Sequence, residues 1–225
     1  CLHLSYIKPH WPYIAPEPYA SMYGPEDVKP AIRSEKERQE AHPVFAAYMD
    51  MRSSRNMSRD EAREKVIPAY MGLITQIDDQ MGVLMKFLEE RGLIDDTMIV
   101  FTSDHGDYLG DHWMGEKDLF HDQSARIPLI VIDPSREADA TRGSVCDALV
   151  EGIDLAPTFI EYFGGTPPDH ILEGRSLMCE AAIRDLRGEA DEPAQCCRRA
   201  KRQADPERTR NLAPAAHHAA TPRTP

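Results

Sequence analysis

Between residues 104 and 122 the sequence gathers side chains that can bind metal ions and anions. This segment contains three of the nine histidines and six carboxylates: Asp104, Asp107, Asp111, Glu116, Asp118 and Asp122. The pair Asp104 and His105 offers one hard oxygen and one imidazole nitrogen, half of a ligand set for a divalent cation. The alternative is a solvated acidic loop whose histidines only cap or hydrogen-bond. Gly106 and Gly110 allow the segment to turn tightly.

Two further side chains could act on an anionic substrate. Lys117 lies among the acids and could neutralise a sulfate or phosphate group, although pairing with Glu116 or Asp118 is the alternative. His10 lies in Lys-Pro-His-Trp-Pro at 8–12, where prolines on both sides restrict the backbone. A histidine held in place suits proton donation to a leaving group, whereas packing in a proline turn is the alternative.

The elements around this segment predict an α/β fold. Residues 97–102 and 127–132 are continuous apolar runs, typical of strands buried on both faces of a parallel sheet. Loops at the carboxyl ends of such strands are where α/β folds bind ligands, so residues 104–122 are well placed. We predict a mostly parallel sheet flanked by helices.

The clearest helix begins at Ser58 and ends at Gly92. Ser58 with Glu61 forms a capping-box pattern, and apolar residues then recur at helical spacing. Pro68 is expected to kink this helix or to break it in two.

Other segments are less strongly patterned. Residues 2–7 alternate as a strand does, and the six prolines within 9–30 predict an extended, rigid loop. Residues 31–55 are weakly helical, whereas residues 153–163 form an amphipathic helix ended by Gly164 and Gly165. The chain opens on the strand 2–7 without a methionine, so we expect further sequence upstream.

Composition excludes several classes of protein. The net charge of −12 argues against nucleic acid as the main partner, and no apolar run approaches the ~20 residues of a membrane span. Without a leader, the five cysteines suggest a reduced, cytoplasmic setting. Residues 1–178 carry −14 and residues 179–225 carry +2. We predict a partial catalytic domain over 1–177 and an atypical, disordered tail over 178–225.

The order of motifs resembles the sulfatases and phosphonate monoester hydrolases of the alkaline phosphatase superfamily. Phe-Thr-Ser-Asp-His-Gly-Asp at 101–107, Gly-Asp-His at 110–112, Glu-Lys at 116–117 and Arg-Ile-Pro-Leu-Ile at 126–130 match the family's carboxyl half. The proline-flanked histidine at 9–12 matches as well. The resemblance covers roughly residues 2–177 and implies an alkaline-phosphatase-like sandwich, incomplete at its amino terminus.

The resemblance also implies roles for four residues. Asp104 and His105 would be metal ligands, Lys117 would bind sulfate or phosphoryl oxygens, and His10 would contact the ester oxygen and protonate the leaving group. The metal would be calcium, manganese or zinc. His105 replaces the asparagine of many sulfatases and favours the transition metals, because nitrogen suits them better than calcium. The substrate would be a small sulfate or phosphonate ester, and an oligomer is possible.

The chain departs from the family at its nucleophile. Family members use a formylglycine matured from cysteine in Cys-x-Pro-Ser-Arg or Cys-x-Ala-x-Arg, and none of the five cysteines stands in that context. The leading prediction is therefore a fragment of a metal-dependent ester hydrolase, inactive alone. A non-catalytic metal- or anion-binding remnant and a phosphomutase-like member of the superfamily are the alternatives.

Overall fold

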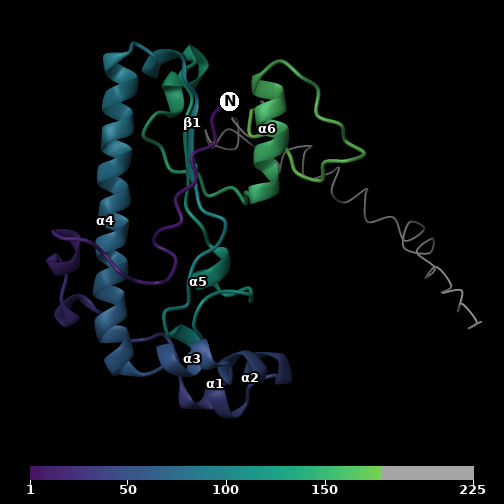
Figure 1. The fold of residues 1–225 in the computed structure, drawn as a ribbon. Helices are drawn as coiled ribbons and strands as arrows, with labels where there is room; N and C mark the ends of the chain where they lie inside the picture. The colour runs from purple at the N-terminus through teal and green to yellow at the C-terminus, as the bar shows by residue number, and fades with distance from the viewer. Residues whose placement is uncertain (179–225) are drawn as a thin grey trace, which may run out of the picture. The chain divides into compact units, whose positions relative to one another are not determined.

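The computed structural model describes residues 1–178, so the tail predicted over 178–225 lies, apart from Met178, outside the described residues (Figure 1). The chain divides into two compact units, Cys1–Asp139 and Ala140–Pro225. The sequence pattern did not predict a division at this point. All four residues singled out for the site belong to the first unit.

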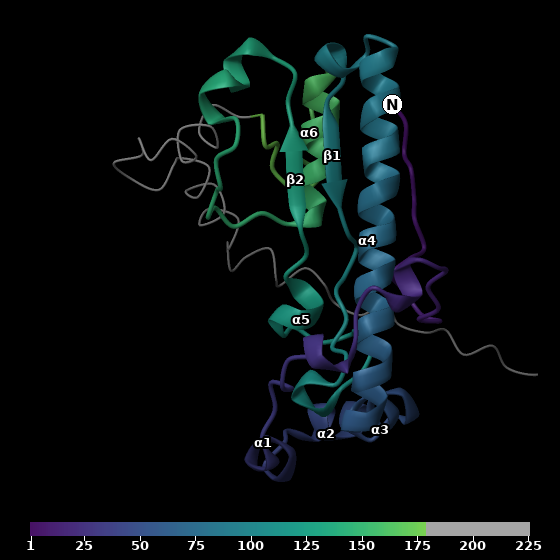
Figure 2. The ribbon, with the colours of Figure 1, turned by 90° about the vertical axis from the view of Figure 1, so that its left-hand side faces the viewer.

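The longest element of the first unit is helix α4 (Asp60–Glu90) (Figures 1 and 2). Pro68 lies inside it and does not break it in two, contrary to one of our expectations. Ser58 is not its N-cap. Its backbone is helical (φ −74°, ψ −5°) and closes the preceding helix, whereas an N-cap needs an extended backbone. Its hydroxyl donates to the Ser54 carbonyl, so the capping-box prediction is wrong.

Three short helices precede α4 and gather near its first turns (Figures 1 and 2). They are α1 (Glu35–Gln39), α2 (Pro43–Met49) and α3 (Arg52–Met57), and they confirm the weak helical pattern predicted over 31–55. The Ser34 hydroxyl caps α1 by accepting a hydrogen bond from the Glu37 amide.

The proline-rich segment packs on α4 as an irregular loop with two 3₁₀ turns, η1 (Tyr19–Ser21) and η2 (Pro25–Asp27). Gly72 of α4 permits this approach, since a Cβ there would lie 2.3 Å from the Tyr19 carbonyl oxygen. Residues 2–7 form no strand, contrary to prediction. Alternation specifies the faces of a strand but supplies no partner, and no described strand pairs with this segment.

The sheet of the described residues contains β1 (Ile99–Thr102) and β2 (Leu129–Ile132). They pair antiparallel, with Ile99 opposite Ile132, so the prediction of a mostly parallel sheet is wrong for this part of the chain. Burial on both faces is also not observed, because Ile130 remains 56 % exposed. An apolar run identifies a strand but not its direction or what covers it.

Short elements surround these strands. In the first unit they are η3 (Ile94–Asp96), η4 (Asp111–Trp113) and α5 (Asp122–Ala125), and η5 (Arg136–Thr141) leads into the second. The second unit contains η6 (Gly152–Asp154) and α6 (Leu155–Tyr162), confirming the predicted helix 153–163. Gly164 follows with a left-handed φ of 76°. Among the described helices, none combines the length and apolar character that crossing a membrane requires.

Candidate metal and anion site

The structure brings His10, His105 and Lys117 into contact. The Lys117 Nζ lies 2.9 Å from the His105 Nε2 and 3.3 Å from the His10 Nε2. Asp104 is beside them, with its Oδ2 3.5 Å from the His105 Nε2 and its side chain 86 % exposed. Residues more than 100 positions apart in the sequence therefore form one cluster, which we call the lysine cluster: His10, Asp104, His105 and Lys117.

Lys117 does not make the surface ion pair that was its alternative. Within the described part of the chain, none of its ion pairs joins Lys117 to Glu116 or Asp118. Its ammonium instead faces two imidazole nitrogens. An ammonium has only protons to offer, so both nitrogens must present lone pairs.

Backbone carbonyls fix the tautomers of both histidines. The His105 Nδ1 lies 2.7 Å from the Gly106 carbonyl oxygen, and the His10 Nδ1 lies 3.0 Å from that of Trp11. A carbonyl oxygen only accepts, so each Nδ1 carries the proton and each Nε2 is free of one. This is the arrangement in which a histidine binds a metal through Nε2, with a carbonyl orienting the ring.

The turn after β1 holds the Asp104–His105 pair in place. The Ser103 hydroxyl donates to the His105 carbonyl at 2.8 Å, and the His105 amide donates to the Asp104 Oδ1 at 3.0 Å. Gly106 donates to the Ser124 carbonyl, and a Cβ at this position would lie 2.0 Å from the Gln123 carbonyl oxygen. Only glycine allows the backbone to approach this closely.

A partly buried hydrogen bond joins the His10 loop to this turn. The Tyr13 hydroxyl donates to the Asp107 Oδ2 at 2.6 Å, and the Leu109 amide donates to its Oδ1 at 3.0 Å. Burial raises the pKa of the Asp107 carboxyl, and these two donors oppose that shift. Burial and the Asp107 carboxylate raise the pKa of Tyr13. Sequence reasoning missed this pair, although Tyr13 stands three residues after His10.

The loop that carries Lys117 has an unusual backbone. Five non-glycine residues have left-handed φ values between 46° and 97°: Leu109, His112, Trp113, Glu116 and Asp118. Such conformations cost L-residues about 1 kcal/mol or more each, so surrounding contacts must impose them.

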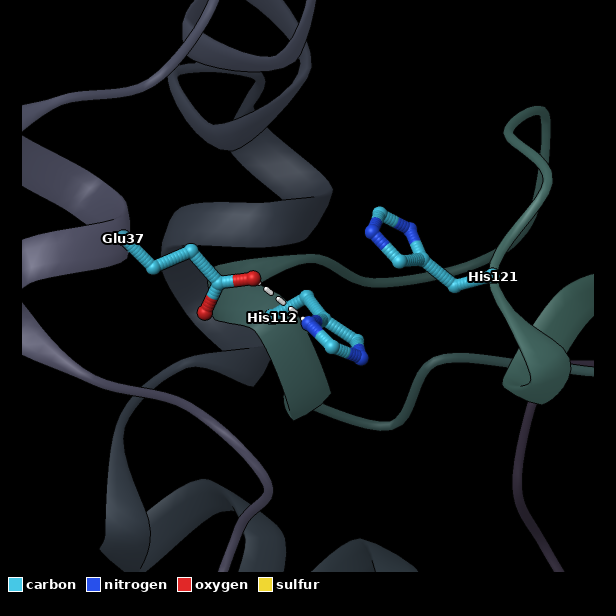
Figure 3. A group of neighbouring side chains, drawn as sticks. All are labelled: Glu37, His112 and His121. Carbon is cyan, nitrogen blue, oxygen red and sulfur yellow. Dashed lines mark hydrogen bonds and ion pairs between the residues drawn. The ribbon is translucent and has the colours of Figure 1, made fainter.

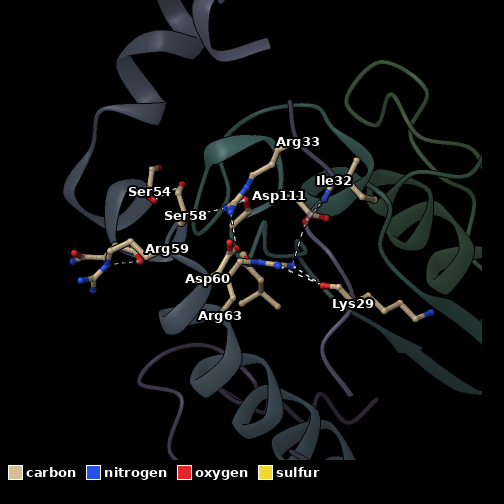
Figure 4. A network of polar contacts seen from close by, with 12 residues as sticks. Lys29, Ile32, Arg33, Ser54, Ser58, Arg59, Asp60, Arg63 and Asp111 are labelled. Carbon is tan, nitrogen blue, oxygen red and sulfur yellow. Dashed lines mark hydrogen bonds and ion pairs between the residues drawn. The ribbon is translucent and has the colours of Figure 1, made fainter. Parts of the chain in front are cut away.

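A polar network supplies part of that constraint (Figure 4). The Arg63 side chain, only 7 % exposed, donates to the Leu109 carbonyl at 3.0 Å and lies 3.6 Å from the Asp111 Oδ1. Burial lowers the pKa of the Arg63 guanidinium, and Asp111 opposes that shift. Arg33 donates to the carbonyls of Ser58 and Gly110. The sequence pattern gave no signal for Arg63, which lies in the first turn of a long helix.

A second group of ionisable residues lies in the same unit (Figure 3). It consists of Glu37, His112 and His121, and we call it the glutamate cluster. Within residues 1–178 these three form the one group of three or more possible metal ligands held close together, whereas Asp104 and His105 form a pair. Sequence reasoning included both histidines among the possible metal-binding side chains of residues 104–122, but not Glu37, which lies outside that segment.

Comparison with known proteins now defines the family. The sulfatase family model matches residues 1–165. The chain belongs to the sulfatase family. The resemblance drawn from the motifs around Asp104, Lys117 and His10 is thereby confirmed.

Two relatives are similar to most of this sulfatase-family chain. A multifunctional alkaline phosphatase superfamily protein, PehA, of Trinickia caryophylli is 39 % identical over 190 residues, covering 79 % of this chain and 36 % of its own. An arylsulfatase of Clostridium perfringens is 32 % identical over 176 residues, which cover 78 % of this chain and 36 % of the arylsulfatase.

Solved structures agree with these relatives. The phosphonate monoester hydrolase of Agrobacterium radiobacter superposes with a TM-score of 0.70 at 30 % identity, over 82 % of this chain and 38 % of that one. The fold is therefore that of the alkaline-phosphatase-like sulfatases. The chain spans little more than a third of the length of these relatives.

Proposed function

We propose that this chain carries the metal- and anion-binding part of a hydrolase of sulfate or phosphonate esters. The observation that supports it is the lysine cluster, in which one ammonium and two oriented imidazoles converge beside an exposed carboxylate. The names of the relatives support the substrate class.

Asp104 and His105 fit a divalent ion. The Asp104 Oδ2 and the His105 Nε2 both present lone pairs and lie 3.5 Å apart with no proton to share. Neighbouring ligands on an ion with bonds of 2.0–2.2 Å are about 3.0–3.4 Å apart. The nitrogen donor favours manganese or zinc over calcium. When bound, such an ion would supply positive charge that polarises the ester.

Lys117 and His10 would then act on the substrate. The Lys117 ammonium now contacts the nitrogen that a metal would occupy, so it must turn away on metal binding. It is then free to bind the non-bridging oxygens of a sulfate or phosphonate, where charge develops during hydrolysis. His10 would protonate the leaving oxygen through Nε2, after first taking up a proton at this nitrogen.

The reaction also needs a nucleophile, which none of the five cysteines provides in the family's sequence context. We therefore propose that the 225-residue chain binds the metal and the anion but does not turn over ester on its own. Assays with an aryl sulfate and an aryl phosphonate, with Mn²⁺ added, would show metal-dependent turnover if this is wrong.

Binding tests the proposal directly. Calorimetry with Mn²⁺ on the full chain should show a site that is lost in Asp104→Asn and retained in Asp122→Asn, a similarly exposed aspartate. With Mn²⁺ present, sulfate or phenylphosphonate should bind, and Lys117→Ala should remove this binding while Lys86→Ala does not. Metal binding without anion binding would favour the non-catalytic remnant, and equal loss in the controls would refute the site.

A further inference from the structure

The glutamate cluster joins three elements of the first unit (Figure 3). Glu37 comes from α1, His112 from η4, and His121 precedes α5 as its N-cap residue. The Glu37 Oε1 lies 2.6 Å from the His112 Nδ1, and both side chains are largely buried, at 30 % and 18 % exposure. A contact this short between a carboxylate and an imidazole in a partly buried place is a strong, charge-assisted hydrogen bond.

His121 completes the group in a defined orientation. Its ring stacks on that of His112, with centroids 4.1 Å apart and planes at 15°. Its Nδ1 lies 2.9 Å from the hydroxyl of Tyr108, which is 1 % exposed. Within the described residues no hydrogen bond engages its Nε2.

One carboxylate oxygen and two imidazole nitrogens therefore converge, with their ligand atoms within 4.8 Å of one another. A tetrahedral zinc ion holds its ligand atoms about 3.3 Å apart. From separations of up to 4.8 Å, closure needs shifts of up to about 1.5 Å, and the Glu37–His112 pair at 2.6 Å must lengthen slightly. Side-chain torsions of Glu37 and His121 can provide these shifts, and the His121 ring must rotate out of its stack. The ion would replace the proton between Glu37 and His112.

We propose that Glu37, His112 and His121 form a second metal site, for a divalent transition metal of the zinc class. The donor set of two nitrogens and one oxygen suits such an ion, and water would complete it. Tyr108 is a positioning residue for the His121 ring. The ion would tie α1 to the loop that also carries Lys117. This proposal does not rest on the proposed hydrolase function.

The test must exclude other zinc ligands in the full chain. The other potential ligands include all five cysteines and a pair of adjacent histidines: Cys1, Cys146, Cys179, Cys196, Cys197, His217 and His218. The reference protein is therefore the 225-residue chain with these cysteines changed to serine and these histidines changed to alanine. It also carries Asp104→Asn, which removes the proposed metal ligand of the lysine cluster. Zn²⁺ is titrated by calorimetry, and Co²⁺ absorption reports the coordination.

We expect one equivalent of Zn²⁺ to bind the reference protein. Glu37→Gln and His121→Gln should each remove that equivalent, and Tyr108→Phe should weaken it about tenfold or more. Glu35→Gln on the same helix and the exposed His3→Gln are the matched controls and should bind as the reference does. If the reference binds no zinc, or if the Glu37 and His121 variants bind as tightly as the controls, the proposal is overturned.

X-ray absorption keeps the proposal falsifiable should a variant fail to fold. At the zinc edge the loaded reference protein should show two imidazoles and only nitrogen or oxygen ligands. Sulfur in the coordination shell, or fewer than two imidazoles, would refute it. Loss of Mn²⁺ binding at Asp104 does not change the X-ray absorption result. The proposals for the lysine cluster and the glutamate cluster can therefore be refuted independently.

Discussion

The lysine cluster and the glutamate cluster each contain two imidazoles and a central charged side chain, Lys117 in one and Glu37 in the other, with opposite charges. In the first, the Lys117 ammonium lies between His10 and His105, beside an Asp104 side chain that is 86 % exposed. In the second, the Glu37 carboxylate contacts His112 at 2.6 Å, and both are largely buried. The sign and exposure of the partner decide what each pair of histidines can do.

The comparison separates two uses of histidine within one loop. In the lysine cluster, an ammonium beside two unprotonated imidazole nitrogens at an exposed site suits reversible binding of an anion. The exposed Asp104 carboxylate can hold the accompanying metal. A partly buried carboxylate against stacked imidazoles suits a cation that remains bound. Substitutions that disturb one cluster and spare the other test this difference.

Removing Arg63 should damage both clusters at once. Arg63→Met leaves Asp111 and the Leu109 carbonyl without their buried partner, at a cost of about 3–5 kcal/mol in the free energy of unfolding. Urea denaturation measures this loss. Arg59→Met, an exposed neighbour, should cost little, and an equal loss in the two variants would contradict the role given to Arg63.

Tyr13→Phe should affect the lysine cluster alone. It leaves the buried Asp107 Oδ2 without its donor, which we expect to cost about 1–3 kcal/mol and to loosen the His10 loop. Histidine NMR should show the His10 signals moving while those of His112 and His121 stay. Tyr6→Phe is the control, and coupled changes in both clusters would contradict their separation.

Acid should act through the glutamate cluster. The folded pKa of His121 is lowered below its ordinary value of 6.5, so below that pH the unfolded chain binds the proton more readily. The contribution of His121 to stability is therefore fully present above pH 6.5 and is lost as pH falls through its folded pKa. Thermal unfolding of the metal-free chain should show a decline over this range that is shallower in His121→Gln.

Asp104→Asn should have the smallest effect on stability. Because its side chain is 86 % exposed, we expect a change within about 0.5 kcal/mol, together with loss of the Mn²⁺ site in the lysine cluster. Denaturation and calorimetry on the same protein check both. A large loss of stability would mean that Asp104 is structural.

Sequence reasoning identified the members of the lysine cluster but not how they meet. His10, His105 and Lys117 were found because the short motifs and the glycine spacing around them can be recognised in the sequence alone. The tautomers that leave the Nε2 of His10 and of His105 unprotonated depend on the carbonyls of Trp11 and Gly106. No sequence motif encodes these contacts. The roles of these residues remain predictions.

The errors in the fold have a common physical origin. The apolar runs at 97–102 and 127–132 identified both strands, but strand direction depends on how the chain returns, and their pairing is antiparallel. The capping pattern at Ser58 did not predict the start of α4, because Ser58 is the C-cap of the preceding helix α3. In each case a local pattern was overridden by a neighbour that only the tertiary structure supplies.

The left-handed residues of the loop from Leu109 to Asp118 have a consequence for engineering. Gly110 and the hydrogen bond from its amide to the Met114 carbonyl favour part of this backbone, but the arginines that hold it come from elsewhere in the chain. The loop is therefore not a portable module. Grafted onto another scaffold, it would carry Lys117 and His112 but not their placement, and a designer would have to transplant the first turn of α4 with it.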